Sequence, residues 1–212
     1  MIHQVPHAEV KEFHWSWLYK VSGAAALLAS ALLLVAAIDL MMAGLKPGAN
    51  NGWLSLFQDN WLVLIFKMHA GLGEVEANLL HVPNLLDIAI LALVGTMCLG
   101  LHAALKGTSK TWSLVALALP FIGIILFTIT KIAGRSSVMG AGLIISLVML
   151  RNNTFNKVTA YMGILANVLL LGGDFSVGIP HSNLISTLFG IGYVLLTAWY
   201  FLLGRRLLQL GK

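Results

Sequence analysis

Residues 21–45 read VSGAAALLASALLLVAAIDLMMAGL, and the only charged side chain among them is Asp39. An α-helix crosses the hydrocarbon core of a bilayer with about 20 apolar residues, so this stretch is typical of a membrane-spanning helix. Four more stretches have a similar length and character, at 82–105, 112–132, 158–178 and 184–203. A sixth, 138–150, is shorter and needs Ser136 and Ser137 or a thinned bilayer to complete a crossing.

The composition of the whole chain agrees with this pattern. Hydrophobic residues make up 58% of the 212 residues and charged residues only 10%, whereas a soluble domain carries about 25% charged residues. The mean hydropathy is +0.88. We therefore expect an all-α integral membrane bundle of about six transmembrane helices, in which residues 1–212 form a single transmembrane domain.

The Lys and Arg residues indicate how such a bundle is oriented. With six spans and a cytoplasmic N-terminus, the cytoplasmic residues are Lys11, Lys20, Lys106, Lys110, Arg151, Lys157, Arg205, Arg206 and Lys212. Only Lys46, Lys67, Lys131 and Arg135 lie outside. Because cytoplasmic loops carry an excess of Lys and Arg, the sequence predicts a multi-pass protein of the plasma (inner) membrane with both termini cytoplasmic. The net charge of +5 then reflects topology and contact with anionic membrane lipid, and no nucleic-acid partner is predicted.

Three local features complete the prediction for the spans. Residues 1–20 are expected to form a cytoplasmic segment, because they are too long and polar for the charged region of a cleaved signal peptide. Cys98 is the only cysteine and lies within a span, so it is expected to be a buried apolar side chain. An interfacial aromatic belt is predicted from residues near the cytoplasmic span ends: Trp15, Trp17, Tyr19, Trp112 and Trp199.

The longest predicted connection joins the first two spans. It opens with KPGANNG at 46–52, which is turn-forming. The following stretch, 53–68, mixes Trp, Leu and Phe with polar and charged residues, so it is too polar to span the membrane. Residues 46–80 are therefore expected to form an extracytoplasmic loop that contains an interfacial helix.

The densest group of chemically reactive side chains follows this loop. In a helix, Glu74, Asn78 and His81 lie at i, i+4 and i+7 and form one polar stripe. Such a stripe must face protein or water, because a carboxylate facing lipid is costly. Asp87 and Asp174 are predicted to lie near the same outer ends of the spans. We expect Glu74, His81, Asp87 and Asp174 to line an outward-facing polar pocket.

A structural alternative remains open for these residues. Lys131 and Arg135 can instead neutralise Asp39, Asp87 or Asp174 as ion pairs. Glu74, Glu76 and His69 are then solvated loop residues. No particular metal or cofactor is predicted, since Glu74 and His81 are seven residues apart, roughly 10 Å along a helix, too far to bind one ion alone. No catalytic motif is found, so no catalytic residue is assigned.

Two polar patterns are expected to serve helix packing. In the last span, small and polar residues recur at steps of three and four and predict a bundle-facing stripe: Ser186, Gly190, Tyr193, Thr197, Tyr200 and Gly204. In the preceding span, Asn167 is expected to form an interhelical hydrogen bond.

The chain resembles a known family from about the first span to the C-terminus, most specifically in its second half. Its motifs are GLIISLVMLR at 142–151 and FNKVTAYMGILANVLLLG at 155–172, with NLLDIAILALVG at 84–95, AGRSSVMG at 133–140 and RRLLQLG at 205–211. These segments are similar to an uncharacterised prokaryotic membrane family, the domain of unknown function four-three-eight-six. The resemblance implies a helical membrane protein of prokaryotic type and carries no activity, cofactor or catalytic residue.

Three functions are compatible with the sequence. The first is a membrane protein that binds or moves a small ligand or cation through the outward polar pocket. The second is an accessory subunit of a larger membrane complex, with partner subunits or further copies of itself. The third is a membrane enzyme that uses His81 with Glu74 or Asp87 as acid and base on a lipid-like substrate. Low charge content and the missing motifs weigh against the enzyme.

Overall fold

The computed structural model describes four parts of the chain, residues 15–45, 85–129, 131–175 and 183–212. They form six α-helices: α1 (Trp15–Leu45), α5 (Leu85–Leu105), α6 (Lys110–Ile129), α7 (Lys131–Leu150), α8 (Lys157–Phe175) and α9 (Asn183–Leu210). The expected all-α architecture is confirmed in these parts. The loop and interfacial helix predicted at 46–80 lie outside the described residues.

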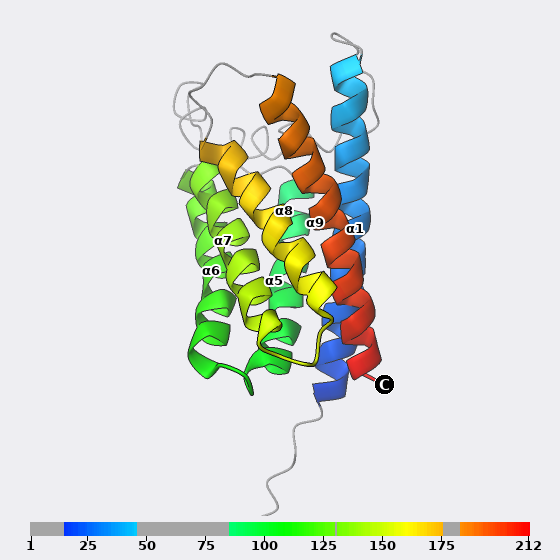
Figure 1. Cartoon of the computed structure of the whole chain (residues 1–212), viewed down its shortest axis with the longest axis vertical. Coiled ribbons are helices and arrows are strands. Elements are labelled where there is room, and N and C mark those ends of the chain that lie inside the picture. Colours follow the sequence, from blue (N-terminus) through cyan, green and yellow to red (C-terminus); the bar gives the residue numbers. More distant parts are fainter. Residues whose placement is uncertain (1–14, 46–84, 130, 176–182) are drawn as a thin grey trace, which may run out of the picture.

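The six helices lie side by side and form a closed ring (Figure 1). Along the ring α1 packs against α5, α5 against α6, α6 against α7, α7 against α8 and α8 against α9, while α9 returns to α1. The start of α1 and the C-terminus lie at one end, where the Ser16 hydroxyl donates a 2.9 Å hydrogen bond to the Gly211 carbonyl. We name this end the terminal end and the other the distal end.

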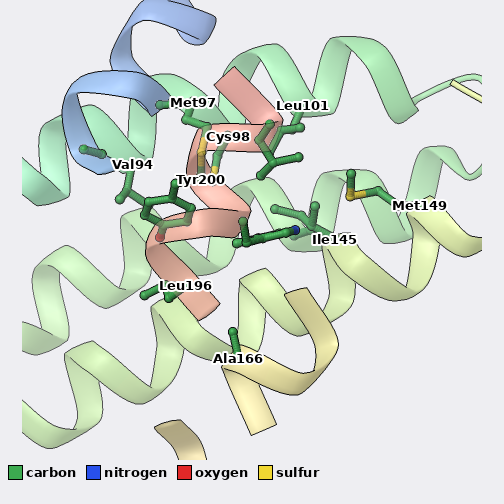
Figure 2. Close-up of a cluster of buried hydrophobic side chains, with 14 of the residues drawn as sticks. Val94, Met97, Cys98, Leu101, Ile145, Met149, Ala166, Leu196 and Tyr200 are labelled. Atoms are coloured by element: carbon green, nitrogen blue, oxygen red, sulfur yellow. The ribbon is translucent and has the colours of Figure 1, made fainter. Parts of the chain in front are cut away.

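Large apolar side chains fill the centre of the ring. Met97 and Leu101 of α5, Met149 of α7 and Leu196 of α9 are each at most 1% exposed. Figure 2 shows these residues converging with Cys98. Cys98 is 3% exposed, so its prediction as a buried apolar residue is confirmed.

Three of the described helices contain apolar stretches long enough to cross a membrane. These stretches are Trp15–Val35 in α1, Ile88–Leu105 in α5 and Gly190–Leu210 in α9. The apolar stretches of α6, α7 and α8 are shorter, at Lys110–Gly123, Gly134–Leu150 and Lys157–Gly172. Length and composition therefore mark three of the six helices as candidate membrane spans.

Helix α7 is longer than its apolar run predicted. The sequence predicted an apolar stretch at 138–150, but the helix begins at Lys131. Tertiary contacts explain the difference, since the Ser137 hydroxyl donates a 2.8 Å hydrogen bond to the Leu119 carbonyl of α6. A Cβ at Gly123 would lie 3.0 Å from the Gly134 carbonyl, so the two backbones approach closely. Such packing overrides the weak helix propensity of Gly and Ser.

The bundle-facing stripe predicted on α9 is confirmed at Thr197, Tyr200 and Gly204, but not at Gly190, where an added Cβ would meet no atom within 4 Å. Thr197 and Tyr200 are buried, and Gly204 lies directly against α1. A Cβ on Gly204 would be 2.9 Å from the Gly23 carbonyl, and one on Gly23 would be 2.9 Å from the Gly204 carbonyl. Small residues at this seam let two antiparallel backbones touch, as is common between membrane helices.

Candidate functional site

The residues predicted to line an outward pocket are only partly described. Glu74 and His81 lie outside the described residues. Asp87 is the third residue of α5 and Asp174 is the penultimate residue of α8, and the side chains of both lie outside the described set. Both helix ends belong to the distal end (Figure 1). The structure thus brings these two positions to one end of the bundle.

Asp39 adds a third carboxylate position at the same end. It lies six residues before the last residue of α1, and α1 packs against α5, which carries Asp87. Asp39, Asp87 and Asp174 are the only acidic residues within the described ranges. Lys131 and Arg135, in the first turns of α7, are the cations on described helices at this end.

The terminal end has the opposite character. Its described cations are Lys20, Lys106, Lys110, Arg151, Lys157, Arg205, Arg206 and Lys212, and no described acidic residue accompanies them. Counting Glu9, Lys11 and Glu12 from the preceding segment would lower this surplus by a single charge. The two ends of the bundle therefore differ strongly in charge.

The turn between α7 and α8 holds part of this charge on a defined backbone. Asn152 Oδ1 accepts a 2.7 Å hydrogen bond from the Thr154 N–H, and Asn156 Oδ1 accepts one of 3.1 Å from the Val158 N–H. The first is the local bond of an Asx turn and the second caps the start of α8. Arg206 Nε of α9 donates a 2.6 Å hydrogen bond to the Thr154 carbonyl, which ties the turn to α9.

Aromatic side chains surround the terminal end, although the predicted belt is wrong at one position. Trp17 is 66% exposed and Trp112 is 54% exposed, as expected for a belt. Trp199 is only 1% exposed and packs inside the ring beside Tyr200. Trp199 faces α8 and packs directly on Gly163, where an added Cβ would run into the indole nitrogen.

A Ser–His pair near the terminal end was not predicted from the sequence. His102 Nδ1 and Ser113 Oγ are 2.7 Å apart, and the Ser113 hydroxyl also lies 3.3 Å from the His102 carbonyl. Ser113 is 3% exposed, and the adjoining space between α5, α6 and α7 does not admit a water-sized sphere. A nucleophile needs access to substrate, which the buried Ser113 lacks. The pair is therefore a structural hydrogen bond between α5 and α6.

Buried polar groups also meet between α7, α8 and α9. Asn167 Nδ2 donates a 2.7 Å hydrogen bond to the Gly163 carbonyl of its own helix, so the predicted interhelical bond is wrong. Its side chain instead packs on Gly142 of α7, where a Cβ would lie 2.5 Å from Asn167 Oδ1. Within the same layer, the Trp199 indole N–H is buried without a hydrogen-bond acceptor.

These features define a class of protein: an all-helical bundle with candidate membrane spans and oppositely charged ends. The described residues hold no group of three His, Cys, Asp or Glu side chains placed to bind a metal ion. No protein-family model, curated protein or solved structure matches the chain. Its resemblance to the domain of unknown function four-three-eight-six, and the prokaryotic type that it implies, therefore stay predictions.

Proposed function

We propose that the chain is a six-span protein of the plasma membrane that binds or moves a small ligand or cation through a polar pocket at the distal end. Membrane placement is supported by large apolar side chains on the outside of the ring, such as Leu28 at 58% and Ile122 at 47% exposed. Soluble monomers rarely expose large contiguous apolar surfaces. The charge surplus of the terminal end favours the cytoplasm for that end and for both termini.

One observation carries the proposed pocket: the acidic positions on α1, α5 and α8 all belong to the distal end. A carboxylate in a membrane span avoids lipid and faces protein or a water-filled cavity. Asp39, Asp87 and Asp174 therefore supply negative charge toward the distal end of the bundle. Glu74 and His81, which precede α5 in sequence, would add to the same pocket. A carboxylate-rich site favours a cation or a cationic small molecule.

The test is thermal denaturation of the full chain in mild detergent, with and without a panel of mono- and divalent metal chlorides and organic amines. At least one of these cations should raise the melting temperature of the wild type. The rise should disappear in Asp87→Asn and in His81→Ala. Glu9→Gln is the matched control, because Glu9 belongs to the predicted cytoplasmic segment and its variant should keep the full rise. An unchanged rise in both pocket variants would refute the proposal.

A second candidate is an accessory subunit of a larger membrane complex, favoured by the outer surface of α6. This helix packs against α5 and α7 and exposes Leu114, Phe121 and Ile125 on the outside of the ring. A partner helix could cover this surface in place of lipid. Copurification of a stoichiometric subunit from native membranes, detected by native mass spectrometry, supports this role. A lone monodisperse chain argues against it.

A further inference from the structure

At the edge of the terminal end, which we call the rim, exposed cations lie close in sequence to exposed aromatic rings. Lys110 is exposed at the start of α6, and Trp112 follows two residues later at 54% exposed. Lys157 is exposed at the start of α8, and Tyr161 follows one helical turn later at 61% exposed. Trp17, in the first turn of α1, is 66% exposed. Three helices that start at this end thus carry an exposed ring within about a turn of their first residue.

The cations of this rim are not neutralised by described residues. Lys110, Arg151 and Lys157 are exposed and form no ion pair within the described parts of the chain. Two neighbouring cations have other partners: Lys106 Nζ lies 3.8 Å from the centre of the Trp15 ring, and Arg206 bonds the Thr154 carbonyl. Neither partner is a carboxylate. Among the described residues, no carboxylate competes with an anionic partner for these cations.

Part of this charge is held in place before any partner binds. Arg151 and Lys157 flank the turn between α7 and α8, and Phe155 between them is 4% exposed and anchors the turn in the core. The Asn152 and Asn156 side chains and the bond from Arg206 fix the backbone of the turn. A fixed backbone lowers the ordering cost of binding.

We propose that the rim of the terminal end binds the headgroups of anionic phospholipids, with Lys110, Arg151 and Lys157 as the cations that contact phosphate. The inference rests on the proposed placement of the bundle in the membrane. The exposed aromatic rings identify the occupant, because Trp and Tyr settle at the level of the lipid headgroups. A soluble anion would gain nothing from rings beside the cations, whereas a lipid presents phosphate to the cations and glycerol and acyl chain to the rings.

The experiment compares short-chain phosphatidylglycerol with phosphatidylcholine on the full chain in nonionic detergent, by native mass spectrometry at an ionic strength of about 0.1 M. The wild type should retain phosphatidylglycerol in clear preference. In the double variant Lys110→Gln/Lys157→Gln, phosphatidylglycerol binding should weaken by roughly tenfold or more, because each cation near an anionic surface strengthens binding about fivefold. Phosphatidylcholine binding should stay unchanged.

The matched control removes the same charge from the other side of the predicted topology. Lys46→Gln/Lys131→Gln should change phosphatidylglycerol binding by less than about twofold, because charges beyond a Debye length are largely screened. Equal retention of the two lipids by the wild type, or an equal loss in both double variants, would overturn the inference. So would competition by glycerol phosphate as strong as by the lipid.

Membrane fractionation separates this inference from the function on which it rests. Release of the chain from membranes by an alkaline wash without detergent would contradict both proposals. A chain that stays in the membrane but does not distinguish the lipids contradicts only the lipid site. Loss of cation stabilisation at the distal end, with the lipid preference intact, contradicts only the pocket.

Discussion

The seam between α1 and α9 is built from small, closely packed residues, whereas the outer surface of α6 carries large, exposed apolar side chains. At the seam, Gly23 and Gly204 bring the two backbones into contact, and the Ser30 hydroxyl donates a 3.0 Å hydrogen bond to the Thr197 carbonyl. On α6, large apolar side chains such as Leu114 and Ile122 point away from the ring. Lipid tails are as apolar as leucine, so helices in a membrane associate through close packing of small residues and hydrogen bonds.

This contrast predicts the largest effect for a charge on the outer surface of α6. Ile122→Arg places a guanidinium at the centre of the predicted span. It should make the free energy of membrane insertion less favourable by about 3 kcal/mol, the scale found for Arg at a helix centre. The measurement is the inserted fraction in a membrane-integration assay. Leu114→Arg is the control near the terminal end, where a long cationic side chain reaches the interface, and should insert almost normally. Normal insertion of Ile122→Arg would place the α6 surface in water.

A smaller effect on stability is expected for Gly→Ala substitutions in α9. The substitution should destabilise the protein at the seam and stabilise it away from the seam. Gly204→Ala forces a methyl group against the α1 backbone and should lower stability by about 1–3 kcal/mol, the usual cost of overpacking. Gly190→Ala, on the same helix, meets no described atom within 4 Å. It should stabilise by about 0.5–1 kcal/mol, because Ala is the better helix former. Melting temperatures in one detergent test this, and shifts of the same sign would contradict close packing at the seam.

The smallest effect concerns the hydrogen bond across the same seam. Ser30→Ala removes the bond to the Thr197 carbonyl and should lower stability by about 0.6 kcal/mol, the average for side-chain hydrogen bonds between membrane helices. The control, Ala24→Ser, adds a hydroxyl to an exposed position of α1 and should change the melting temperature little. A loss above about 2 kcal/mol for Ser30→Ala would show that polar contacts dominate this seam over packing.

The sequence predicted the helices better than their ends and contacts. Long apolar runs located all six described helices, because each of these helices contains such a run. The sequence missed the first turn of α7, where α6 packs closely on Gly134. It misplaced Trp199, because apolar character does not distinguish an interfacial ring from a core ring. The described stripe on α9 was predictable, since small residues at helical spacing indicate a contact face.

The candidate site was predictable only as a location. Charge counting along the sequence placed Asp87 and Asp174 on one side, and the structure brings their helix positions to the distal end. The pair of His102 and Ser113 was not predicted, because it forms across the turn between α5 and α6. No spacing within one helix signals such a contact.

The most direct test of the account is the sidedness of the two ends in right-side-out membrane vesicles. In a Cys98→Ala background, Asn153→Cys probes the turn between α7 and α8, and Asn183→Cys probes the start of α9. A membrane-impermeant maleimide should label the Asn183→Cys variant at once and the Asn153→Cys variant only after the vesicles are opened. Labelling of both variants in sealed vesicles, or the reverse order, would contradict a membrane-spanning bundle with a cytoplasmic terminal end.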